Sequence, residues 1–471
     1  MLDYQEFTAK DKSLLIAPAG YGKTHTIAES IKHTEGKQLI LTHTHAGVAS
    51  IKEKLKKSGI ESGRYNVETI TSFAQKYVFS FCDAALIPSQ EDNKSYYPFI
   101  INKATQLLQL KPIRKVIICT YNGLFVDEYQ DCTVEHHNLI LGLSDILTTR
   151  LLGDHLQGIF KFGRGSLVDM NNADMMGGFH TNSFALSVPW RWMQGNKELG
   201  SDLDIIRKQL LNSAQIDLNS FKSIEKIITS DVYSDKPTYF RISNLLNQEQ
   251  SLLIIHPDSK NLKKRVQFIQ RFNNRCRLIE SIDNKDFYSL SRTADTMTSE
   301  NAVVVVLELC KAVFNKTGIS IWFNDRGVKK KTKQTDKLII LPIAALLENL
   351  KKTVSFSNVA EILKMIRKLP NITCYRKELL STLCKALEEA EYNSTSVYDS
   401  MVNNRNILRR VGRKIYGTCI GTTLLTKGLE FDTVVVLNAN EFDCPKNLYV
   451  ALSRATKKLI VISSSSTLNP Y

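Results

Sequence analysis

The sequence predicts an α/β protein built on parallel sheets, and three observations support this fold class. Short runs of aliphatic and β-branched residues recur through the first third of the chain, and stretches with helical spacing separate them. The runs are continuously apolar, as in strands that are covered on both faces. A similar segment begins near Leu252 and resumes at Gly417. This alternation is typical of doubly wound domains, which bind ligands at the carboxyl ends of their strands.

The predicted elements follow one another along the chain with one interruption in each half. Residues 76–114 contain aromatic, proline and polar residues and are interpreted as a small insertion. Residues 193–235 show helical spacing, and residues 290–412 are interpreted as a helical insertion, with clear helices at 358–367 and 376–391. In the first third, the expected strands are 13–17, 38–42, 116–120, 124–126 and 151–153, and the expected helices are 24–32 and 46–57.

Size and composition set limits on the class of protein. A chain of 471 residues with 43% hydrophobic residues is long enough for two to four folded domains. The net charge of +15 favours a polyanionic partner, either nucleic acid or an anionic membrane surface, although many lysine-rich proteins bind neither. None of the cysteines forms a C-x-x-C pair, so a structural zinc site is not expected. The apolar stretch 338–350 is too short to span a membrane, and a cytoplasmic location is predicted.

A glycine-containing loop joins the first predicted strand to the first predicted helix. Gly20 and Gly22 allow the backbone N–H groups to face a phosphate at the positive end of the helix. Lys23 can neutralise the β- and γ-phosphates, and the Thr24 hydroxyl can ligate Mg²⁺. Ala17 stands where the strict pattern has glycine, and the alternative is a chance Gly-Lys-Thr turn. The predicted nucleotide-binding loop is Ala19, Gly20, Tyr21, Gly22, Lys23, Thr24 and His25.

Two adjacent carboxylates end the strand predicted at 124–126. Asp127 is suited to hold Mg²⁺, which prefers oxygen ligands. Glu128 can accept a proton from an attacking water as a general base. The alternative is a strand that simply stops at a polar surface. A phosphate loop followed by this acidic element predicts a nucleoside triphosphate hydrolase.

The segment Val126-Asp-Glu-Tyr-Gln-Asp resembles the Asp-Glu-x-Gln-Asp element of the UvrD/Rep-like superfamily 1 helicases, and further motifs follow in family order. Leu152-Gly-Asp-His-Leu-Gln-Gly-Ile-Phe and Leu186-Ser-Val-Pro-Trp-Arg are similar to the next two family motifs. The resemblance implies that Gln157 senses the γ-phosphate, that Trp190 stacks on adenine and that Arg191 contacts the γ-phosphate.

Two more family motifs lie near the C-terminal end of the sequence. Lys427-Gly-Leu-Glu-Phe and Tyr449-Val-Ala-Leu-Ser-Arg-Ala resemble signatures of the second motor domain. The resemblance implies nucleotide contacts from Gly428 and Glu430 and a second arginine finger at Arg454, for which the alternative is a surface arginine on a helix. It also implies two RecA-like motor domains, at residues 1–235 and 236–471.

The same resemblance implies a path for nucleic acid. Thr44 and His45 lie in a segment similar to the family element that holds the DNA backbone, and Thr69, Ser72 and Phe73 match a second such element. Phe160 and Phe162 occupy positions where the family stacks aromatic residues on bases, and the alternative is that they fill a core.

Two basic clusters lie outside these motifs and could grip duplex or a partner, although a charge run is usually a solvated face. They are Arg326, Lys329, Lys330, Lys331 and Lys333, and Arg405, Arg409, Arg410, Arg413 and Lys414.

The resemblance predicts an ATP- and Mg²⁺-dependent DNA helicase or translocase that acts on single-stranded or partly single-stranded DNA with 3′→5′ polarity. The alternative is an ATP-gated DNA sensor or a regulatory subunit, and an RNA motor also stays open. The small insertions make the chain similar to helicase subunits that pair with a nuclease, as in Gabija-type phage defence. A nuclease partner and a role in repair or antiviral defence are expectations from that similarity.

Overall fold

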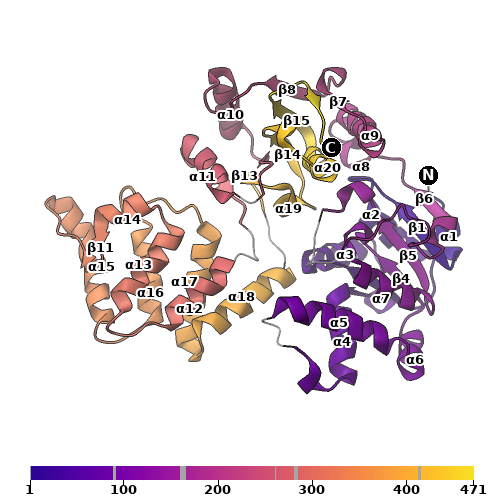
Figure 1. Cartoon of the computed structure of the whole chain (residues 1–471), viewed down its shortest axis with the longest axis horizontal. Coiled ribbons are helices and arrows are strands. Elements are labelled where there is room, and N and C mark those ends of the chain that lie inside the picture. Colours follow the sequence, from indigo (N-terminus) through magenta and orange to yellow (C-terminus); the bar gives the residue numbers. More distant parts are fainter. Residues whose placement is uncertain (1, 89–91, 160–165, 260, 281–284, 412–414) are drawn as a thin grey trace. The chain divides into compact units, whose positions relative to one another are not determined.

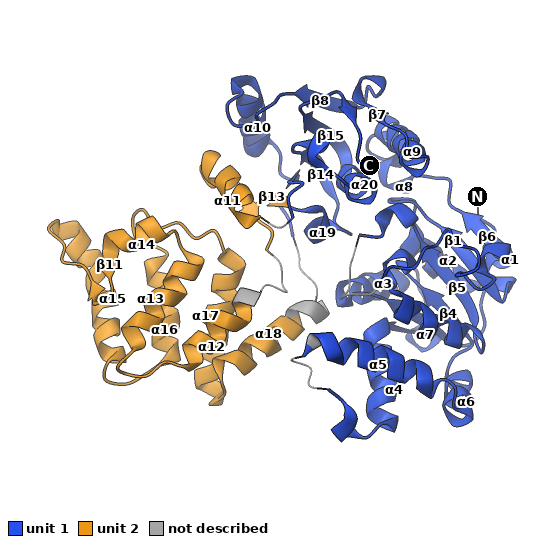
Figure 2. Cartoon of the chain, viewed as in Figure 1, with its two compact units in different colours: residues 1–260, 411–418, 422–471 blue, residues 261–410, 419–421 orange. Residues whose placement is uncertain are grey.

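The computed structural model describes the chain apart from residues 1, 89–91, 160–165, 260, 281–284 and 412–414 (Figure 1). Its contacts divide the chain into two compact units, shown in Figure 2. Unit 1 contains residues 1–260, 411–418 and 422–471, and unit 2 contains residues 261–410 and 419–421. Both predicted halves of the nucleotide site therefore belong to unit 1.

A six-stranded parallel sheet forms the N-terminal half of unit 1, with the strand order β3-β2-β4-β5-β1-β6. Successive strand residues point to opposite faces of the sheet: Leu14 packs against one helical layer and Leu15 against the other. The strands are β1 (Lys12–Ile16), β2 (Gln38–Thr42), β3 (Tyr65–Thr69), β4 (Gly123–Val126), β5 (Thr148–Gly153) and β6 (Ser183–Ala185).

Helices cover both faces of this sheet, as the doubly wound class requires (Figure 1). The helices α1 (Tyr4–Ala9), α2 (Lys23–Lys32) and α3 (His45–Lys57) share a core with one face. The helices α4 (Ile70–Phe81), α5 (Asn93–Leu107), α6 (Lys111–Thr120) and α7 (Val134–Ser144) share a core with the other. Polar residues begin several of these helices: Thr44, Thr69 and Thr133 each accept a hydrogen bond from a first-turn backbone N–H.

The prediction of a strand at 116–120 is wrong, because these residues end helix α6. Ile113 and Ile117 are buried four residues apart, whereas Val116, Ile118 and Cys119 are exposed. The run is apolar on more than one helix face, so its composition resembles that of a buried strand. Pro112, in the first turn of α6, is typical of a helix start. Strand β3 at 65–69 was not predicted, since its residues alternate with polar ones.

A second parallel sheet contains four strands of unit 1 in the order β9-β14-β15-β8. They are β9 (Leu252–Ile255), β14 (Phe431–Val436), β15 (Ala455–Ser463) and β8 (Ile224–Ile228), and the helices α9 (Lys197–Leu211), α10 (Lys236–Gln248) and α20 (Pro445–Leu452) belong to the same half. Strand β8 pairs with β15 although it precedes residue 236, so the chain enters the second sheet before the predicted domain start. Two sheets of this kind confirm the predicted α/β class with two RecA-like domains.

Unit 2 is mainly helical. Its core joins α12 (Lys285–Asp295), α13 (Ala302–Val313), α14 (Lys316–Trp322), α15 (Gln334–Leu350), α16 (Phe356–Ile366), α17 (Lys377–Asn393) and α18 (Val397–Val411). A short hairpin of β11 (Phe323–Asn324) and β12 (Gly327–Val328) interrupts the helices. Strand β10 (Arg277–Leu278) pairs in parallel with residues 419 and 420 of β13 (Thr418–Gly421), and α11 (Leu262–Arg271) precedes it.

Within the described part of the chain, no helix combines the length and the apolar character needed to cross a membrane. The same residues contain no group of three or more His, Cys, Asp or Glu side chains arranged to hold a metal ion.

Candidate nucleotide-binding site

The loop between β1 and α2 has the backbone of a phosphate-binding loop. Gly20 and Gly22 adopt φ values of +78° and +91°, in the left-handed region that favours glycine. A Cβ atom on residue 20 would lie 2.7 Å from Cβ of Arg191, so the close approach of the two segments also requires glycine. Gly22 precedes the first residue of α2 and has no side chain to cap the helix. The first-turn N–H groups of α2 are thus available to an anion at the positive end of the helix.

Lys23 and Glu128 form the central ion pair of the site. The Lys23 Nζ lies 2.8 Å from Oε2 of Glu128 and 3.9 Å from Oδ1 of Asp127. Burial on its own would raise the pKa of Glu128, but Lys23 and Lys427 outweigh it and lower this pKa to about 2. Glu128 is therefore a carboxylate at neutral pH, the state that a general base needs. Its backbone is left-handed, at φ 54° and ψ 40°, which is uncommon for a residue other than glycine.

Asp127 lies beside this pair at the end of β4 and is buried. Its Oδ1 finds no hydrogen-bond partner among the described residues. Burial raises the pKa of Asp127 to about 7, although Lys23 opposes this change. An oxygen that is buried and lacks a hydrogen bond fits a hard divalent cation such as Mg²⁺. Thr24, in the first turn of α2, supplies a hydroxyl on the same pocket wall.

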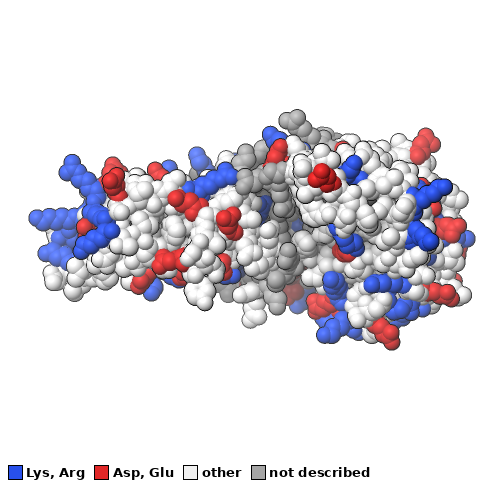
Figure 3. Space-filling view, turned by 90° about the horizontal axis from the view of Figure 1, so that it is seen from below, with Lys and Arg blue, Asp and Glu red and all other residues white. Residues whose placement is uncertain are grey.

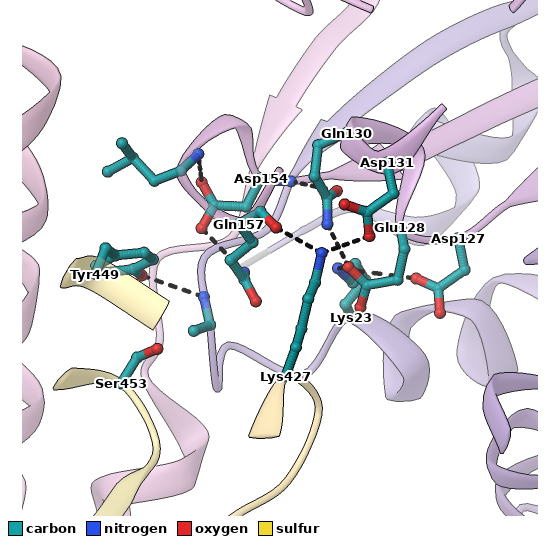
Figure 4. Close-up of polar contacts among 12 residues, drawn as sticks. Lys23, Asp127, Glu128, Gln130, Asp131, Asp154, Gln157, Lys427, Tyr449 and Ser453 are labelled. Carbon is teal, nitrogen blue, oxygen red and sulfur yellow. Dashed lines mark hydrogen bonds and ion pairs between the residues drawn. The ribbon is translucent and has the colours of Figure 1, made fainter. Parts of the chain in front are cut away.

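A hydrogen-bond network holds Glu128 and Gln157 in place (Figure 4). Gln130 donates to Glu128 through Nε2, and its Oε1 accepts from the backbone N–H of Asp154 at 3.0 Å. The buried carboxylate of Asp154 accepts from Nε2 of Gln157 at 3.0 Å and from Arg207 at 3.0 Å. The ends of β4 and β5 are thus joined by side chains, so the predicted base and the predicted γ-phosphate sensor are oriented together.

Residues that flank the strands of the second sheet reach this loop. The guanidinium of Arg191 donates to Oε1 of Glu430 at 2.6 Å and to the carbonyl oxygen of Ser453 at 2.6 Å. The backbone N–H of Arg191 donates to the carbonyl oxygen of Gly20 at 3.0 Å. The Tyr449 hydroxyl accepts from the backbone N–H of Ala19 at 3.3 Å. The phosphate loop is therefore in direct contact with both halves of unit 1.

Lys427 is a site residue to which the sequence analysis gave no role. Its Nζ forms an ion pair with Asp131 and donates to the carbonyl oxygen of Gln157 at 2.5 Å (Figure 4). Burial lowers the pKa of Lys427, and Asp131 and Glu128 oppose this change. The motif Lys-Gly-Leu-Glu-Phe contained the signal, since its lysine belongs to a signature of the second motor domain.

A cavity of about 410 Å³ opens beside these groups, within the range of small-ligand sites. The loop lines it from Pro18 to His25 except Tyr21, and Glu128, Gln157 and Glu430 line its far wall. Helix α3 contributes Ser50, Glu53, Lys54 and Lys57. The structure thus brings together most of the predicted nucleotide-binding residues. Trp190 lies next to the loop, since a Cβ atom on Gly22 would be 3.2 Å from its ring, and half of Trp190 is exposed.

Arg454, Tyr21 and Gly428 are among the predicted residues that do not line the cavity. Arg454 is buried and donates to the carbonyl oxygen of Val450 at 2.9 Å and to Oγ of Ser453 at 2.9 Å. Burial lowers the pKa of Arg454 to about 9. The Tyr21 hydroxyl donates to Asp204 at 3.0 Å, so this residue can contribute to the loop only through its backbone. Gly428 is exposed at φ +81°.

The residues predicted to hold nucleic acid fall into three groups. Thr44 caps α3, of which His45 is the first residue, and Thr69 caps α4 by accepting from the Ser72 backbone N–H at 3.0 Å. Phe73 is 1% exposed and packs against Tyr77 in the core, so its ring is not open to a ligand in this structure and its predicted contact with nucleic acid stays a prediction. The apolar side of α4 must cover the sheet, and Phe73 is on that side. Phe160 and Phe162 lie outside the described residues.

Comparisons with known proteins agree with this arrangement. A family model described as an AAA domain matches residues 4–163, and one described as a viral superfamily 1 RNA helicase core domain matches residues 371–463. The Gabija protein GajB of Bacillus cereus (strain VD045) is 22% identical over 371 residues, which is 76% of this chain and 67% of GajB.

A solved structure of the Arterivirus nonstructural protein 10 helicase with DNA is 14% identical. It covers 53% of this chain, this chain covers 49% of it, and the TM-score of 0.27 is too low to support an argument. The two family matches and the two parallel sheets that frame the phosphate loop carry the assignment. The chain is therefore similar to the superfamily 1 helicases and to the Gabija protein GajB.

Proposed function

We propose that this protein is an ATP-dependent motor that moves along single-stranded DNA in the 3′→5′ direction. The observation that supports the proposal most directly is the pair of contacts from Arg191 to Glu430 and to Ser453, at 2.6 Å each. These contacts couple the phosphate loop to the second sheet. A change at the γ-phosphate would therefore alter the contact between the two halves, which a translocase requires.

The roles of the side chains follow from their positions. Lys23 is paired with Glu128 at 2.8 Å, and its ammonium group would instead pair with the phosphates of a bound nucleotide. The carboxylate of Glu128 would then be free of Lys23 and could accept a proton from water. Gln157, held by Asp154, would orient the water, and Arg191 would stabilise charge on the transferred group. Thr24 and Asp127 would hold Mg²⁺, which supplies charge neutralisation at the phosphates.

The test is steady-state ATP hydrolysis with and without single-stranded DNA. We expect stimulation by DNA, and a loss of about 10²-fold or more in kcat for Glu128→Gln. Glu300→Gln is the matched control, because Glu300 is exposed in unit 2. If wild type with DNA hydrolyses ATP no faster than Glu128→Gln, the motor proposal fails for the isolated chain.

A second candidate is an ATP-gated DNA sensor or a regulatory subunit that pairs with a nuclease in repair or antiviral defence. The placement of Arg454 favours it, since this predicted finger is bound to Val450 and Ser453 of its own half. The similarity to GajB also supports a defence role. Turnover separates the candidates: a sensor hydrolyses ATP slowly and shows no directional movement on DNA. Comparing DNA and RNA of the same sequence as stimulators tests the nucleic acid preference.

A further inference from the structure

Helix α15 of unit 2 has two apolar faces, and only one of them is used by the core. Ile340, Ile343, Leu347 and Leu350 pack inward. On the other side, Leu338, Leu341, Pro342 and Ala345 follow one another at helical spacing and are exposed. Leu338 and Leu341 are 62% and 65% exposed, and the neighbouring Ile339 is 46% exposed. We call Leu338, Leu341, Pro342 and Ala345 the α15 stripe.

Positive charge is concentrated at the N-terminal end of this stripe. Residues 325–337 contain six lysines or arginines against two aspartates. Lysine and arginine side chains gather over this part of unit 2, at the left of the view in Figure 3.

Two of these cations have structural partners in unit 2. Lys329 donates to the carbonyl oxygen of Ser320 at 2.7 Å, and Lys331 donates to that of Ile321 at 2.7 Å, so both stabilise the C-terminal end of α14. The other four side chains, Arg326, Lys330, Lys333 and Lys337, are exposed.

The placement of these four cations has an electrostatic cost. Lys333 is at the N-cap position of α15 and Lys337 is near its first turn, where the helix dipole is positive and favours anions. Asp336, in the first turn, offsets part of this positive charge. Lysines at this end repel the dipole and one another, and a bound carboxylate would relieve both repulsions. The exposed apolar residues of the α15 stripe therefore lie next to a cluster of positive charges. A ligand that is both acidic and apolar would cover the apolar residues and neutralise the cations.

We propose that the α15 stripe and its four flanking cations bind an acidic segment of a different protein, which presents apolar side chains on one face of a helix. Such a helix would lay its apolar face on Leu338 and Leu341 and place its carboxylates against Lys333 and Lys337. This inference does not depend on the proposed motor function.

The surface favours this occupant over three others. A second copy paired in parallel would bring the two basic clusters together, and one paired antiparallel would set each cluster against Glu348, which Lys351 already neutralises. The phosphates of nucleic acid would satisfy the lysines but leave the leucines exposed to water. Glu348 and Lys351 form an ion pair at the C-terminal end of the stripe, and charged side chains there oppose insertion among the acyl chains of a lipid surface.

The experiment uses the full chain and a labelled peptide of glutamate and leucine, roughly 18 residues long, with all leucines on one helical face. A peptide of the same composition with its leucines spread around the helix is the reference. We expect the one-faced peptide to bind more tightly, and Leu338→Asn with Leu341→Asn to weaken it by about tenfold or more. Ile205→Asn is the matched control, because Ile205 is an exposed aliphatic residue of unit 1.

Lys330→Glu with Lys333→Glu should weaken the same peptide by about tenfold, while Lys368→Glu, an exposed lysine elsewhere in unit 2, should not. Melting temperatures close to wild type establish that the variants are folded. Equal binding of both peptides, or binding unchanged in the leucine variant, overturns the proposal.

Three further measurements test the other occupants. The proposal is overturned if a DNA duplex displaces the peptide and its own binding depends only on the lysines. Vesicles of phosphatidylglycerol that bind through the leucines overturn it in favour of a membrane. Dimers in sedimentation that the leucine variant abolishes overturn it in favour of a second copy.

Discussion

Arg191 and Glu430 form an ion pair of 2.6 Å between residues 239 positions apart, and this pair joins the phosphate loop to the second sheet. The same guanidinium donates to the carbonyl oxygen of Ser453. Arg191 is mostly buried, whereas about half of Glu430 is exposed. The carboxylate that pairs with Arg191 is thus open to solvent, and the role proposed for Arg191 requires its guanidinium to exchange this carboxylate for a phosphate.

Arg191→Ala should lower kcat for ATP hydrolysis by about 10³-fold, because arginine fingers contribute on this scale. Arg191→Lys should recover only part of this loss, since an ammonium cannot contact Glu430 and Ser453 with the same geometry. Arg367→Ala, an exposed arginine of unit 2, is the control and should hydrolyse ATP like wild type. A kcat for Arg191→Ala within about threefold of wild type would contradict the role.

Gly20→Ala should destabilise the protein and weaken nucleotide binding. The left-handed backbone at residue 20 costs about 1 kcal/mol for alanine, and the new Cβ would also crowd Arg191 at 2.7 Å. Gly59→Ala separates these effects, since Gly59 has a φ of +74° and nothing within 4 Å of the added Cβ. Thermal melting should show a larger loss for Gly20→Ala, and only this variant should bind nucleotide more weakly. Equal losses would mean that the packing against Arg191 contributes nothing.

Asp127→Asn should raise the Mg²⁺ concentration that gives half-maximal ATP hydrolysis by about tenfold or more, because a neutral amide binds the cation less strongly than a carboxylate. The expectation depends on the buried Oδ1 of Asp127, which has no hydrogen-bond partner among the described residues. Asp174→Asn, at an exposed aspartate, should leave the Mg²⁺ titration unchanged. If both variants titrate like wild type, Asp127 does not hold the ion.

Lys427→Ala should destabilise the protein by about 3–5 kcal/mol, because it leaves the buried carboxylate of Asp131 without its cation. Burial raises the pKa of Asp131 to about 6, above the value of about 3.9 for an unfolded chain. The folded state thus binds more protons between these values, so this group lowers stability as pH rises through that window.

Without Lys427 the pKa of Asp131 should rise further, and the window should extend to higher pH. Chemical denaturation should therefore show a larger loss for Lys427→Ala at about pH 8 than at about pH 5. Adding Asp131→Asn should restore much of the stability, since it removes the uncompensated charge. A loss that is equal at both pH values would show that Asp131 is not the group responsible.

Phe73→Ala should lower the free energy of unfolding by about 3–5 kcal/mol, as expected for a fully buried phenylalanine. Phe79→Ala, in the same helix, is the matched control, because Phe79 is 56% exposed and should cost much less. Folded Phe73→Ala protein should keep its affinity for single-stranded DNA. A loss of DNA affinity without a loss of stability would show that Phe73 contributes to nucleic acid binding.

Much of the fold was predictable because the strands of these sheets are buried on both faces. Leu14, Leu15 and Ile40 are fully buried, so the continuous apolar runs identified β1 and β2. The same criterion failed for α6, where Val116 and Ile118 are apolar and exposed. It also missed β3, in which Glu68 and Asn66 alternate with apolar residues at the edge of the sheet. An apolar run therefore predicts a strand correctly only where its residues are buried on both faces of a sheet.

Residues of the candidate site were predictable where all the residues that act together belong to one short motif. Gly20, Gly22 and Lys23 act within one loop, and Asp127 and Glu128 follow one strand. The contacts of Lys427 with Asp131 and Gln157 join residues 296 and 270 positions apart, and no local pattern reports which residues the fold brings together. Arg454 differs, since its guanidinium is buried and donates to Val450 and Ser453, which are close to it in the sequence.

The left-handed backbone of Glu128 bears on how this protein would respond to selection in the laboratory. Glycine would adopt φ 54° with less strain, and a glutamine would keep the shape of the side chain. Replacement by glycine would remove the carboxylate on which hydrolysis is proposed to depend, while relaxing the chain. A glycine would also leave Lys23 without its carboxylate partner, so the melting temperature of such a variant reports relieved backbone strain and ion-pair loss together, and directed evolution for heat resistance must be coupled to an assay of turnover.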